Sequence, residues 1–449
     1  MTSWHLAKHQ TYALFMMDCN PTLGIFYDMG CGKTAIALSW ILEHLKAGDI
    51  EDALVVCPAS IVPSWGVAID NMVNFDGVTD EDVQMLRDAV TVTSYQKTYK
   101  SEKVPVHHRD GQVTYKKNVK LRDNIDKRWG AIILDESHKA GAHDSLTTKV
   151  MLTLAKLSEH RYIMSGTPVH GGGGKPDYKK MYGQLKFLDD SVWRNWTDFC
   201  QRYVTKYNLW HQPIAYKDAE CEELLQSYGI VCRLEDVFDM PGYNEMTYQC
   251  ELAAKKPYKD IKSGDFLKYN IDLEVAGAQY NKLLQLCSGS LITDDGTLSF
   301  ETSKDDAVRE LLTSTEDKVV IFCRFRASID RVAQLCHDLG RNVVVYDGRA
   351  KKDAWKGFQY GDMDTIVCQY QSGSEGLDLF ASNLMILYEP CFSAKDLEQA
   401  KRRIYRKGQT TPCMYYYLTT PDTIEDKVFS TVRSGVDVTT EMLDKWAHM

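Results

Sequence analysis

Short apolar runs recur along the chain, and their pattern predicts the fold. They occupy residues 53–58, 130–137 and 161–167, and then residues 318–324, 342–348, 364–370, 384–390 and 413–420. Each run is rich in β-branched or aromatic residues and is nearly continuous, without alternation of polar and apolar positions. Such runs are typical of strands buried on both faces of a parallel sheet. Segments with helical spacing, such as residues 328–340, lie between many of them, so the pattern predicts an α/β fold with parallel sheets.

The apolar runs fall into two groups, which indicates two α/β units. A chain of 449 residues also exceeds the size at which a single core keeps growing. The polar, Trp- and Tyr-rich stretch between the groups predicts mainly helices. We therefore expect a first unit over residues 1–232 that includes a helical extension at 176–232. The second unit is expected over residues 233–449 and begins with a helical bridge and insertion at 233–300.

Composition narrows the class of protein. The 44% apolar and 26% charged fractions are those of an ordinary soluble globular protein. No apolar run reaches the length of about 18 residues that a membrane span needs, and the N-terminus does not resemble a signal peptide. The 13 cysteines form no C-x-x-C pair, which disfavours a structural zinc site and indicates a reducing compartment. We expect a cytoplasmic protein of a prokaryote or phage-infected host, or a nuclear protein of a eukaryote, and not a secreted one.

The segment YDMGCGKTAIAL, residues 27–38, predicts a phosphate-binding loop between a strand and a helix. Gly30 and Gly32, which flank Cys31, let the backbone bend closely around an anion at a helix N-terminus. Lys33 would reach the β- and γ-phosphates of ATP, and the Thr34 hydroxyl would help to hold Mg²⁺. The strict form of the motif fails because Tyr27 occupies its first position. The alternative interpretation is a glycine-rich turn beside a solvated lysine.

A second motif, ILDESH, supports the nucleotide site. It ends a predicted buried strand with Asp135 and Glu136. An acid at the carboxyl edge of a parallel sheet, beside a phosphate loop, lies where Mg²⁺ needs a ligand. We assign Asp135 to the metal and Glu136 to the general base that activates the attacking water. Two acids before a loop are often merely solvated, but their position about 100 residues after a Gly-x-Gly-Lys-Thr loop favours the catalytic interpretation.

The order of motifs resembles helicase superfamily 2, and more narrowly the Swi/Snf branch of double-stranded DNA translocases. The motifs are YDMGCGKT, VVCPASIVPSW, VTSYQ, DESH, SGTPVH, VVIFCRF, SGSEGLDL and QAKRRIYRKGQ, and the resemblance extends over roughly residues 4–430. It implies two RecA-like parallel-sheet lobes with a helical insertion between them. The phosphate loop of that superfamily often lacks the early glycine, which accounts for Tyr27. The last motif is the most specific to this branch.

The resemblance implies roles for further residues. Gln10 matches the glutamine that reads the adenine, whereas Gly376 and Asp378 match a second-lobe motif that lines the nucleotide cleft. Arg403 and Arg406 match arginines that approach the γ-phosphate when the cleft closes, although a basic helix face is the alternative. An arginine supplied by a second, mobile domain accelerates phosphoryl transfer about 10³- to 10⁵-fold. It also couples hydrolysis to closure of the two domains. The residues that match motifs coupling hydrolysis to movement are Ser165, Gly166, Thr167, Gln399 and Gln409.

The DNA contacts that the resemblance implies are less well defined. After the second-lobe motif, where the family has Trp-Asn-Pro, this chain has Phe392-Ser393-Ala394, which keeps only the aromatic residue. Residues 97–128 form the most basic stretch, in which Asp110-Gly111 predicts a β-hairpin at 100–120. We expect this hairpin to contact DNA phosphates, and the alternative is a solvated hairpin without a role. The candidate DNA-binding residues are Lys116, Lys117, Lys120 and Arg324.

Together these features predict an ATP- and Mg²⁺-dependent, monomeric DNA motor. Its expected task is to remodel or unwind branched DNA in replication, recombination or repair, with little sequence specificity because phosphate contacts dominate. One alternative is a double-stranded DNA translocase that displaces bound proteins without separating strands. An RNA helicase and a non-catalytic nucleotide-gated scaffold are further alternatives. The net charge of −9 argues only weakly against a nucleic-acid partner, because a local basic stripe sets phosphate affinity.

Overall fold

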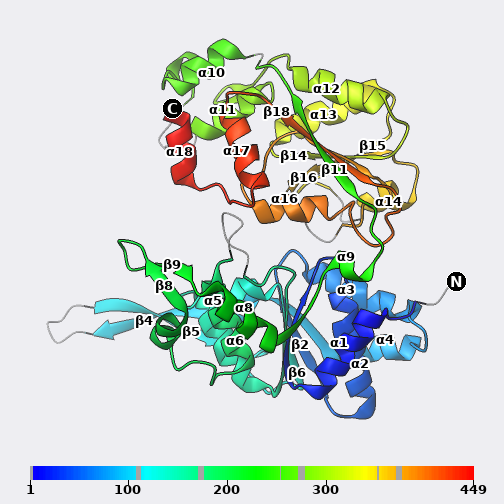
Figure 1. Ribbon diagram of the computed structural model, residues 1–449, viewed down its shortest axis with the longest axis vertical. Helices are drawn as coiled ribbons and strands as arrows, with labels where there is room; N and C mark the ends of the chain where they lie inside the picture. The colour runs from blue at the N-terminus through cyan, green and yellow to red at the C-terminus, as the bar shows by residue number, and fades with distance from the viewer. Residues whose placement is uncertain are drawn as a thin grey trace. The chain divides into compact units, whose positions relative to one another are not determined.

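The computed structural model describes residues 4–107, 113–169, 176–252, 254–271, 279–350, 353–370 and 377–448. It divides into two compact units, which are considered separately below (Figure 1). Unit 1 extends to Phe238 and unit 2 begins at Asp239, whereas the sequence places the boundary after Cys232. In the part of the chain that the structure describes, no helix is both long enough and apolar enough to span a bilayer.

Unit 1 is built on a six-stranded, wholly parallel sheet with the strand order β10-β1-β7-β6-β2-β3. Every residue of β2 and β6 is buried, as their continuous apolar sequences predict. Figure 1 shows α1 to α4 on one face of the sheet and α5, α6 and α8 on the other. The strands are β1 Thr22–Tyr27, β2 Ala53–Cys57, β3 Val90–Ser94, β6 Ala131–Asp135, β7 His160–Met164 and β10 Gly229–Cys232. The helices are α1 Lys8–Cys19, α2 Lys33–Ala47, α3 Val62–Asn71, α4 Asp80–Ala89, α5 Leu146–Leu154, α6 Met181–Leu188, α7 Trp196–Tyr203, α8 Asp218–Ser227 and α9 Leu234–Val237.

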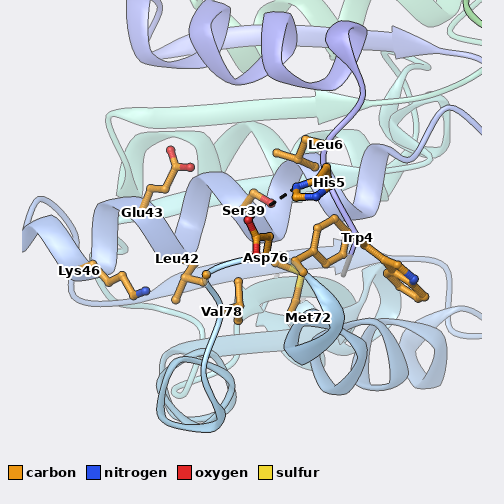
Figure 2. A pocket seen from close by; sticks show the side chains of 12 residues that line it. Trp4, His5, Leu6, Ser39, Leu42, Glu43, Lys46, Met72, Asp76 and Val78 are labelled. Carbon is orange, nitrogen blue, oxygen red and sulfur yellow. Dashed lines mark ion pairs between the residues drawn. The ribbon is translucent and has the colours of Figure 1, made fainter. Parts of the chain in front are cut away.

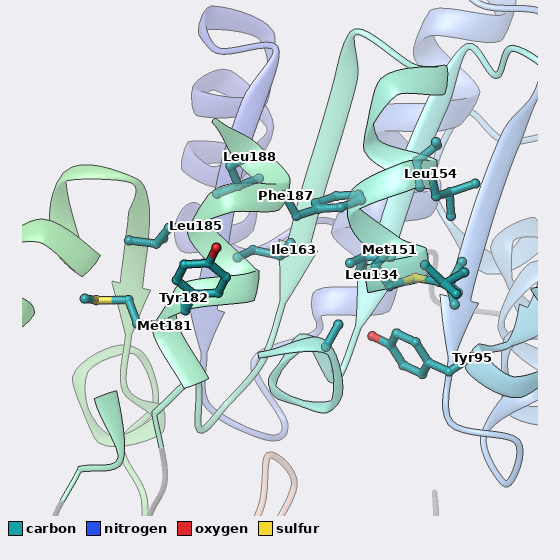
Figure 3. Close-up of a cluster of buried hydrophobic side chains, with 14 of the residues drawn as sticks. Tyr95, Leu134, Met151, Leu154, Ile163, Met181, Tyr182, Leu185, Phe187 and Leu188 are labelled. Atoms are coloured by element: carbon teal, nitrogen blue, oxygen red, sulfur yellow. The ribbon is translucent and has the colours of Figure 1, made fainter. Parts of the chain in front are cut away.

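A large hydrophobic cluster fixes α5 and α6 on the sheet of unit 1 (Figure 3). Met181, Leu185 and Leu188 recur at helical spacing and give α6 one apolar face. That face packs with α5 against strand residues such as Leu134 and Ile163, all of which are buried. Because burying each large apolar side chain contributes about 1.5–3 kcal/mol, this cluster holds the ends of β6 and β7 firmly in place.

Two antiparallel hairpins extend from unit 1. β4 Tyr99–His107 pairs with β5 Val113–Leu121, which confirms the predicted basic hairpin, and its Asp110-Gly111 turn lies outside the described residues. β8 Val204–Tyr207 pairs with β9 Pro213–Tyr216. The prediction that residues 176–232 are helical is therefore wrong in part, because this segment contains the strands β8, β9 and β10. These strands have only four residues each, too few for a hydrophobic period to distinguish them from helical turns.

Unit 2 contains a second six-stranded parallel sheet, with the order β11-β18-β17-β14-β16-β15. All eight apolar runs are thus strands of parallel sheets, and the predicted fold class is confirmed. The strands are β11 Tyr243–Gln249, β14 Val319–Cys323, β15 Val343–Tyr346, β16 Thr365–Gln369, β17 Leu384–Leu387 and β18 Cys413–Thr419, with a small hairpin of β12 Ser290–Thr293 and β13 Gly296–Ser299. The helices are α10 Lys255–Lys262, α11 Gln279–Cys287, α12 Ser303–Thr313, α13 Arg326–Asp338, α14 Trp355–Tyr360, α16 Ala394–Lys401, α17 Ile424–Arg433 and α18 Thr440–His448.

The predicted helical insertion at 233–300 is also wrong in part. β11 lies at the edge of the second sheet, and most of its side chains are exposed. Its sequence, YNEMTYQ, is consequently polar and lacks the continuous apolar character that identifies a central strand. The helices α10 and α11 of the same segment agree with the prediction.

A buried ion pair links two helices of unit 2. The Lys304 ammonium on α12 lies 2.5 Å from a carboxylate oxygen of Glu425 on α17, and neither side chain is exposed to solvent. Lys304 also donates a hydrogen bond of 2.7 Å to the carbonyl of Tyr388. A buried charge is costly unless it is paired and hydrogen-bonded, so each of the two side chains depends on the other.

Candidate active site

The predicted phosphate loop connects β1 to α2. Gly30 has φ 89° and Gly32 has φ 78°, both in the left-handed region that glycine adopts without steric cost. Gly32 is the N-cap of α2, so the loop ends at the N-terminus of a 15-residue helix. Free backbone N–H groups and the helix dipole make such a terminus favourable for an anion.

The Lys33 side chain folds back over this loop. Its ammonium donates hydrogen bonds to the carbonyls of Tyr27 at 2.6 Å and Asp28 at 3.2 Å. Thr34 follows it in the first turn of α2 and is half-buried. The structure thus places the ammonium, the hydroxyl and the helix terminus together, as binding of a nucleotide phosphate requires.

Tyr27 explains why the strict motif is unnecessary here. It is the last residue of β1, its side chain is 1% exposed, and its hydroxyl donates a hydrogen bond of 2.9 Å to the carbonyl of His9 on α1. The bulky side chain therefore lies against α1 and leaves the glycine-rich part of the loop unobstructed.

Gln10 on α1 lies against the phosphate loop. Its Oε1 accepts a hydrogen bond of 2.8 Å from the backbone N–H of Ala7, and its Nε2 donates a longer one of 3.4 Å to the carbonyl of Cys31. A Cβ atom built on Gly32 would lie only 2.0 Å from Gln10 Nε2. The absence of a side chain at Gly32 is therefore what allows α1 to approach the loop.

Asp135 ends β6 with its carboxylate buried and held by two donors. Oδ1 accepts from the backbone N–H of Glu136 at 2.9 Å, and Oδ2 accepts from the indole N–H of Trp65 at 3.0 Å. Burial, reinforced by the charge of Glu136, raises the pKa of Asp135 to about 6 even though Lys33 and Trp65 act in the opposite direction. A divalent cation would relieve this repulsion between the two acids. Carboxylate and hydroxyl oxygens are ligands that Mg²⁺ prefers, so Asp135 and Thr34 fit a magnesium site.

Glu136 has an unusual backbone and a histidine partner. Its φ of 51° lies in the left-handed region, which non-glycine residues rarely adopt and which often marks functional sites. Its Oε2 lies 3.2 Å from Nδ1 of His138, and the same nitrogen lies 3.1 Å from the Ser165 hydroxyl. The Ser165 hydroxyl in turn accepts from the N–H of Thr167 at 3.1 Å. This chain of contacts joins the predicted base to the SGTP motif.

A second connection joins the same two motifs. The Ser137 hydroxyl donates to Gln184 Oε1 at 2.7 Å, and Gln184 Nε2 donates to the carbonyl of Pro168 at 2.7 Å. A Cβ built on Gly166 would lie 3.4 Å from the carbonyl of Tyr27, so the SGTP loop also packs against the phosphate loop. Three predicted motifs of unit 1 therefore meet at one edge of the sheet.

Three residues of this site have no role predicted from the sequence. Trp65 and His138 lie inside the motifs VVCPASIVPSW and DESH, so a signal was available for both. Gln184 is 47 residues from its partner Ser137 and has no local motif, so only the packing of α6 reveals it.

The predicted residues of unit 2 also gather in one place. Arg406 forms an ion pair with Asp378 and donates to the carbonyl of Leu377 at 3.2 Å, and the same carbonyl accepts from the buried Arg403 at 3.3 Å. Gln409 donates to the carbonyl of Ser382 at 2.8 Å and so supports the backbone after Asp378. Gln399 is half-buried on α16, and Gly376 lies outside the described residues. The role expected of the two arginines at the phosphates concerns both units and stays a prediction.

The candidate DNA-binding residues have different surroundings. Lys120 is exposed at the end of β5; Lys116 and Lys117 belong to the same strand, but their side chains lie outside the described part of the structure. Arg324 in unit 2 lies with its guanidinium carbon 3.6 Å from the ring centroid of Phe392, and burial lowers its pKa. Both residues line a cavity of about 690 Å³. No finding tests DNA binding by these four residues, so it stays a prediction.

A smaller cavity of unit 1 is separate from the phosphate loop (Figure 2). It has a volume of about 270 Å³ and lies between α2 and the segments around Trp4 and Asp76. On α2 it begins at Ser39, six residues beyond Lys33, which corresponds to about 9 Å along the helix axis. None of the predicted site residues lines it, and we assign it no role.

The fold and the site define a class of nucleotide-binding α/β proteins in which a phosphate loop and an acid pair share one edge of a parallel sheet. Comparison with protein families gives a narrower assignment. Residues 9–284 match the SNF2-related domain, and residues 303–408 match the helicase conserved C-terminal domain. The chain therefore belongs to the SNF2-related family.

Relatives of the chain are distant in sequence. The DNA repair protein rhp54 of Schizosaccharomyces pombe is 24% identical over 468 residues, covering 90% of this chain and 53% of that protein. The probable global transactivator of Orgyia pseudotsugata multicapsid polyhedrosis virus is 23% identical over 425 residues, covering 85% and 78%. A solved structure, the Sulfolobus solfataricus SWI2/SNF2 ATPase core in complex with dsDNA, is 18% identical with a TM-score of 0.42, covering 96% and 91%. The chain spans about half the length of the yeast relative.

Proposed function

We propose that this chain is a DNA-dependent ATPase that uses ATP and Mg²⁺ to move along DNA. The observation that carries the proposal is the meeting of the Lys33 loop, the Asp135-Glu136 pair and the SGTP loop at one sheet edge. Membership of the SNF2-related family supports it, as does the relative named as a DNA repair protein.

The residues of unit 1 have complementary roles in this proposal. The loop N–H groups and Lys33 bind the β- and γ-phosphates, and Thr34 and Asp135 hold the metal ion. A Mg²⁺ ion held by these two residues would supply positive charge to the phosphate oxygens. Glu136 accepts a proton from that water, and His138 orients the Glu136 carboxylate through the contact of 3.2 Å.

The SGTP loop is the proposed sensor of the nucleotide. It contacts Glu136 through His138 and Ser165, and it contacts the neighbouring Ser137 through Gln184. A change at the base during hydrolysis would therefore reach this loop by two routes. Arg403 and Arg406 are proposed to complete the catalytic machinery from unit 2, where Leu377 and Asp378 orient them.

Remodelling of branched DNA is the proposed task. The test is to measure ATP hydrolysis with single-stranded, blunt duplex, forked and four-way-junction DNA and with duplex RNA, each at two salt concentrations. We expect DNA to stimulate hydrolysis, most strongly when it is branched, and salt to reduce this stimulation steeply. Salt weakens DNA binding because each neutralised phosphate contributes about −0.9 to the slope of the logarithm of the binding constant against the logarithm of the salt concentration. The Lys33→Ala variant is the matched control and should respond to none of these nucleic acids.

Two further outcomes separate the alternatives. Displacement of a protein roadblock from duplex DNA, without unwinding of a labelled fork, would assign the chain to translocation without strand separation. Stimulation by RNA alone would refute the DNA motor proposal.

A further inference from the structure

The second hairpin of unit 1 ends in two exposed apolar side chains. Leu209 and Trp210, between β8 and β9, are 92% and 79% exposed. Among the tryptophans in the described ranges, Trp4 comes next at 48%. An indole in water is unusual because its large apolar surface normally dominates cores or interfaces. Two such side chains at one tip therefore indicate a contact surface.

Hydrogen bonds hold the tip in one conformation. The Asn208 side-chain carbonyl accepts from the backbone N–H groups of Trp210 at 3.0 Å and Gln212 at 2.9 Å. The Asn208 backbone N–H donates to the Gln212 carbonyl at 2.9 Å, and His211 adopts the left-handed region with φ 57°. The backbone that carries the indole is thus fixed before any partner binds, which lowers the entropic cost of binding.

The base of the hairpin is anchored in the core of unit 1. Val204 and Tyr216 pack against the same hydrophobic cluster as Tyr99 and Val119, which belong to the basic β4–β5 hairpin. Figure 1 shows both hairpins extending from the same side of unit 1. The hairpin with the exposed tip and the hairpin that we expect to contact DNA phosphates are therefore anchored in the same hydrophobic cluster.

The charge of the hairpin is compatible with a polyanion. Residues 204–217 contain Lys206, Lys217 and His211 but no aspartate or glutamate, although the whole chain has a net charge of −9. Lys206 is exposed, whereas Lys217 pairs with Glu220 beyond the hairpin. A phosphate backbone could thus approach the tip without facing a carboxylate of the hairpin itself.

We propose that Trp210, supported by Leu209, stacks on an unpaired base where single-stranded DNA leaves a duplex. This inference rests on the proposed function and specifies the DNA structure that the motor engages. Exposed aromatic side chains combined with positive charge are the usual means of binding unpaired bases without sequence preference. Tyr207 and Ile214 of the same hairpin are also exposed, at 45% and 52%. A protein partner still fits less well, because these four side chains provide only part of the roughly 800 Å² that each side of a standard interface buries.

The test compares Trp210→Ala with Trp210→Phe and with Leu267→Ala, which changes an apolar side chain of unit 2 that is 91% exposed. Fluorescence anisotropy measures binding of the full chain to forked, single-stranded and blunt duplex DNA. We expect Trp210→Ala to weaken binding of forked and single-stranded DNA by about 5- to 150-fold, the range for losing one stacked base. Trp210→Phe should retain most of the affinity, Leu267→Ala should retain all of it, and blunt duplex binding should not change.

Other results overturn the inference. Equal losses on all three DNAs, or no loss on forked DNA, would exclude stacking on an unpaired base. Sedimentation velocity that shows self-association of the parent, abolished by Trp210→Ala without a change in fork binding, would identify a protein contact instead. Absence of DNA-stimulated hydrolysis in the parent would refute the proposed function itself. This measurement does not involve a Trp210 variant, so the two failures can be distinguished.

Discussion

Replacing Gly32 by alanine tests the contact between the phosphate loop and α1. The new methyl group would lie 2.0 Å from Nε2 of Gln10, so the Gln10 side chain must move. Alanine would also have to adopt φ 78°, a left-handed conformation that costs an L-residue about 1–2 kcal/mol. The expected loss of stability therefore has a backbone component and a contact component.

The contact component follows from the hydrogen bonds of Gln10. Its displacement breaks the bond from Ala7 at 2.8 Å and the longer bond to Cys31 at 3.4 Å. Each hydrogen bond contributes about 0.5–1.5 kcal/mol, and the longer one lies at the lower end of that range. The two components together predict a loss of about 2–4 kcal/mol for Gly32→Ala.

Gly48→Ala is the matched control. Gly48 follows α2 with φ 76°, nearly the same as Gly32, but no atom lies within 4 Å of a Cβ built there. This variant should lose only the backbone component of about 1–2 kcal/mol. In a Gln10→Ala background, Gly32→Ala should cost no more than Gly48→Ala, because the displaced hydrogen bonds are already absent.

Urea unfolding measures the free energies, and ATP titration of hydrolysis measures KM. We propose that Gln10, which matches the adenine-reading glutamine of the superfamily, contacts the adenine. Gly32→Ala should therefore raise KM for ATP, whereas Gly48→Ala should not. Equal destabilisation by the two glycine variants, or an undiminished cost in the Gln10→Ala background, would refute the packing of α1 on the loop.

Three further predictions concern the ion pair, the base and the metal. Lys304→Met should lower the free energy of unfolding in urea by about 3–5 kcal/mol, because it leaves Glu425 buried without its partner. The double variant Lys304→Met/Glu425→Leu should recover most of this loss. A double variant that is no more stable than Lys304→Met would contradict the prediction. His138→Ala should lower kcat by about 10- to 100-fold through misplacement of Glu136, with binding of a fluorescent ATP analogue unchanged, and an unaltered kcat contradicts the positioning role. EDTA should stop hydrolysis and added Mg²⁺ should restore it, whereas turnover that persists in EDTA contradicts the metal site assigned to Thr34 and Asp135.

Central strands were predictable from the sequence because burial on both faces leaves a continuous apolar run. The exposed edge strand β11 and the short strands β8, β9 and β10 were not, because exposure allows polar residues, as in YNEMTYQ of β11, and a length of four residues hides any period. The local hydrophobic pattern was therefore enough to predict the fold class. The strands between residues 176 and 300 are recognised only from their pairing with other strands in the structure.

The candidate site shows the same division. Lys33 and Asp135 were predictable because the chemistry of phosphates and Mg²⁺ demands these groups in local motifs. The contacts of Gln184 depend on how α6 packs between distant segments, and the side-chain direction of Tyr27 depends on where α1 lies. No pattern of residue spacing along the sequence predicts contacts of this kind.

The proposed motor is tested most directly by the rate of ATP hydrolysis by the parent and by Glu136→Gln, with and without forked DNA. We expect DNA to raise kcat of the parent, and Glu136→Gln to lower the DNA-stimulated kcat by about 10²- to 10⁴-fold while still binding ATP. A variant that hydrolyses ATP as fast as the parent in the presence of forked DNA would contradict the assignment of the catalytic base and the motor built on it.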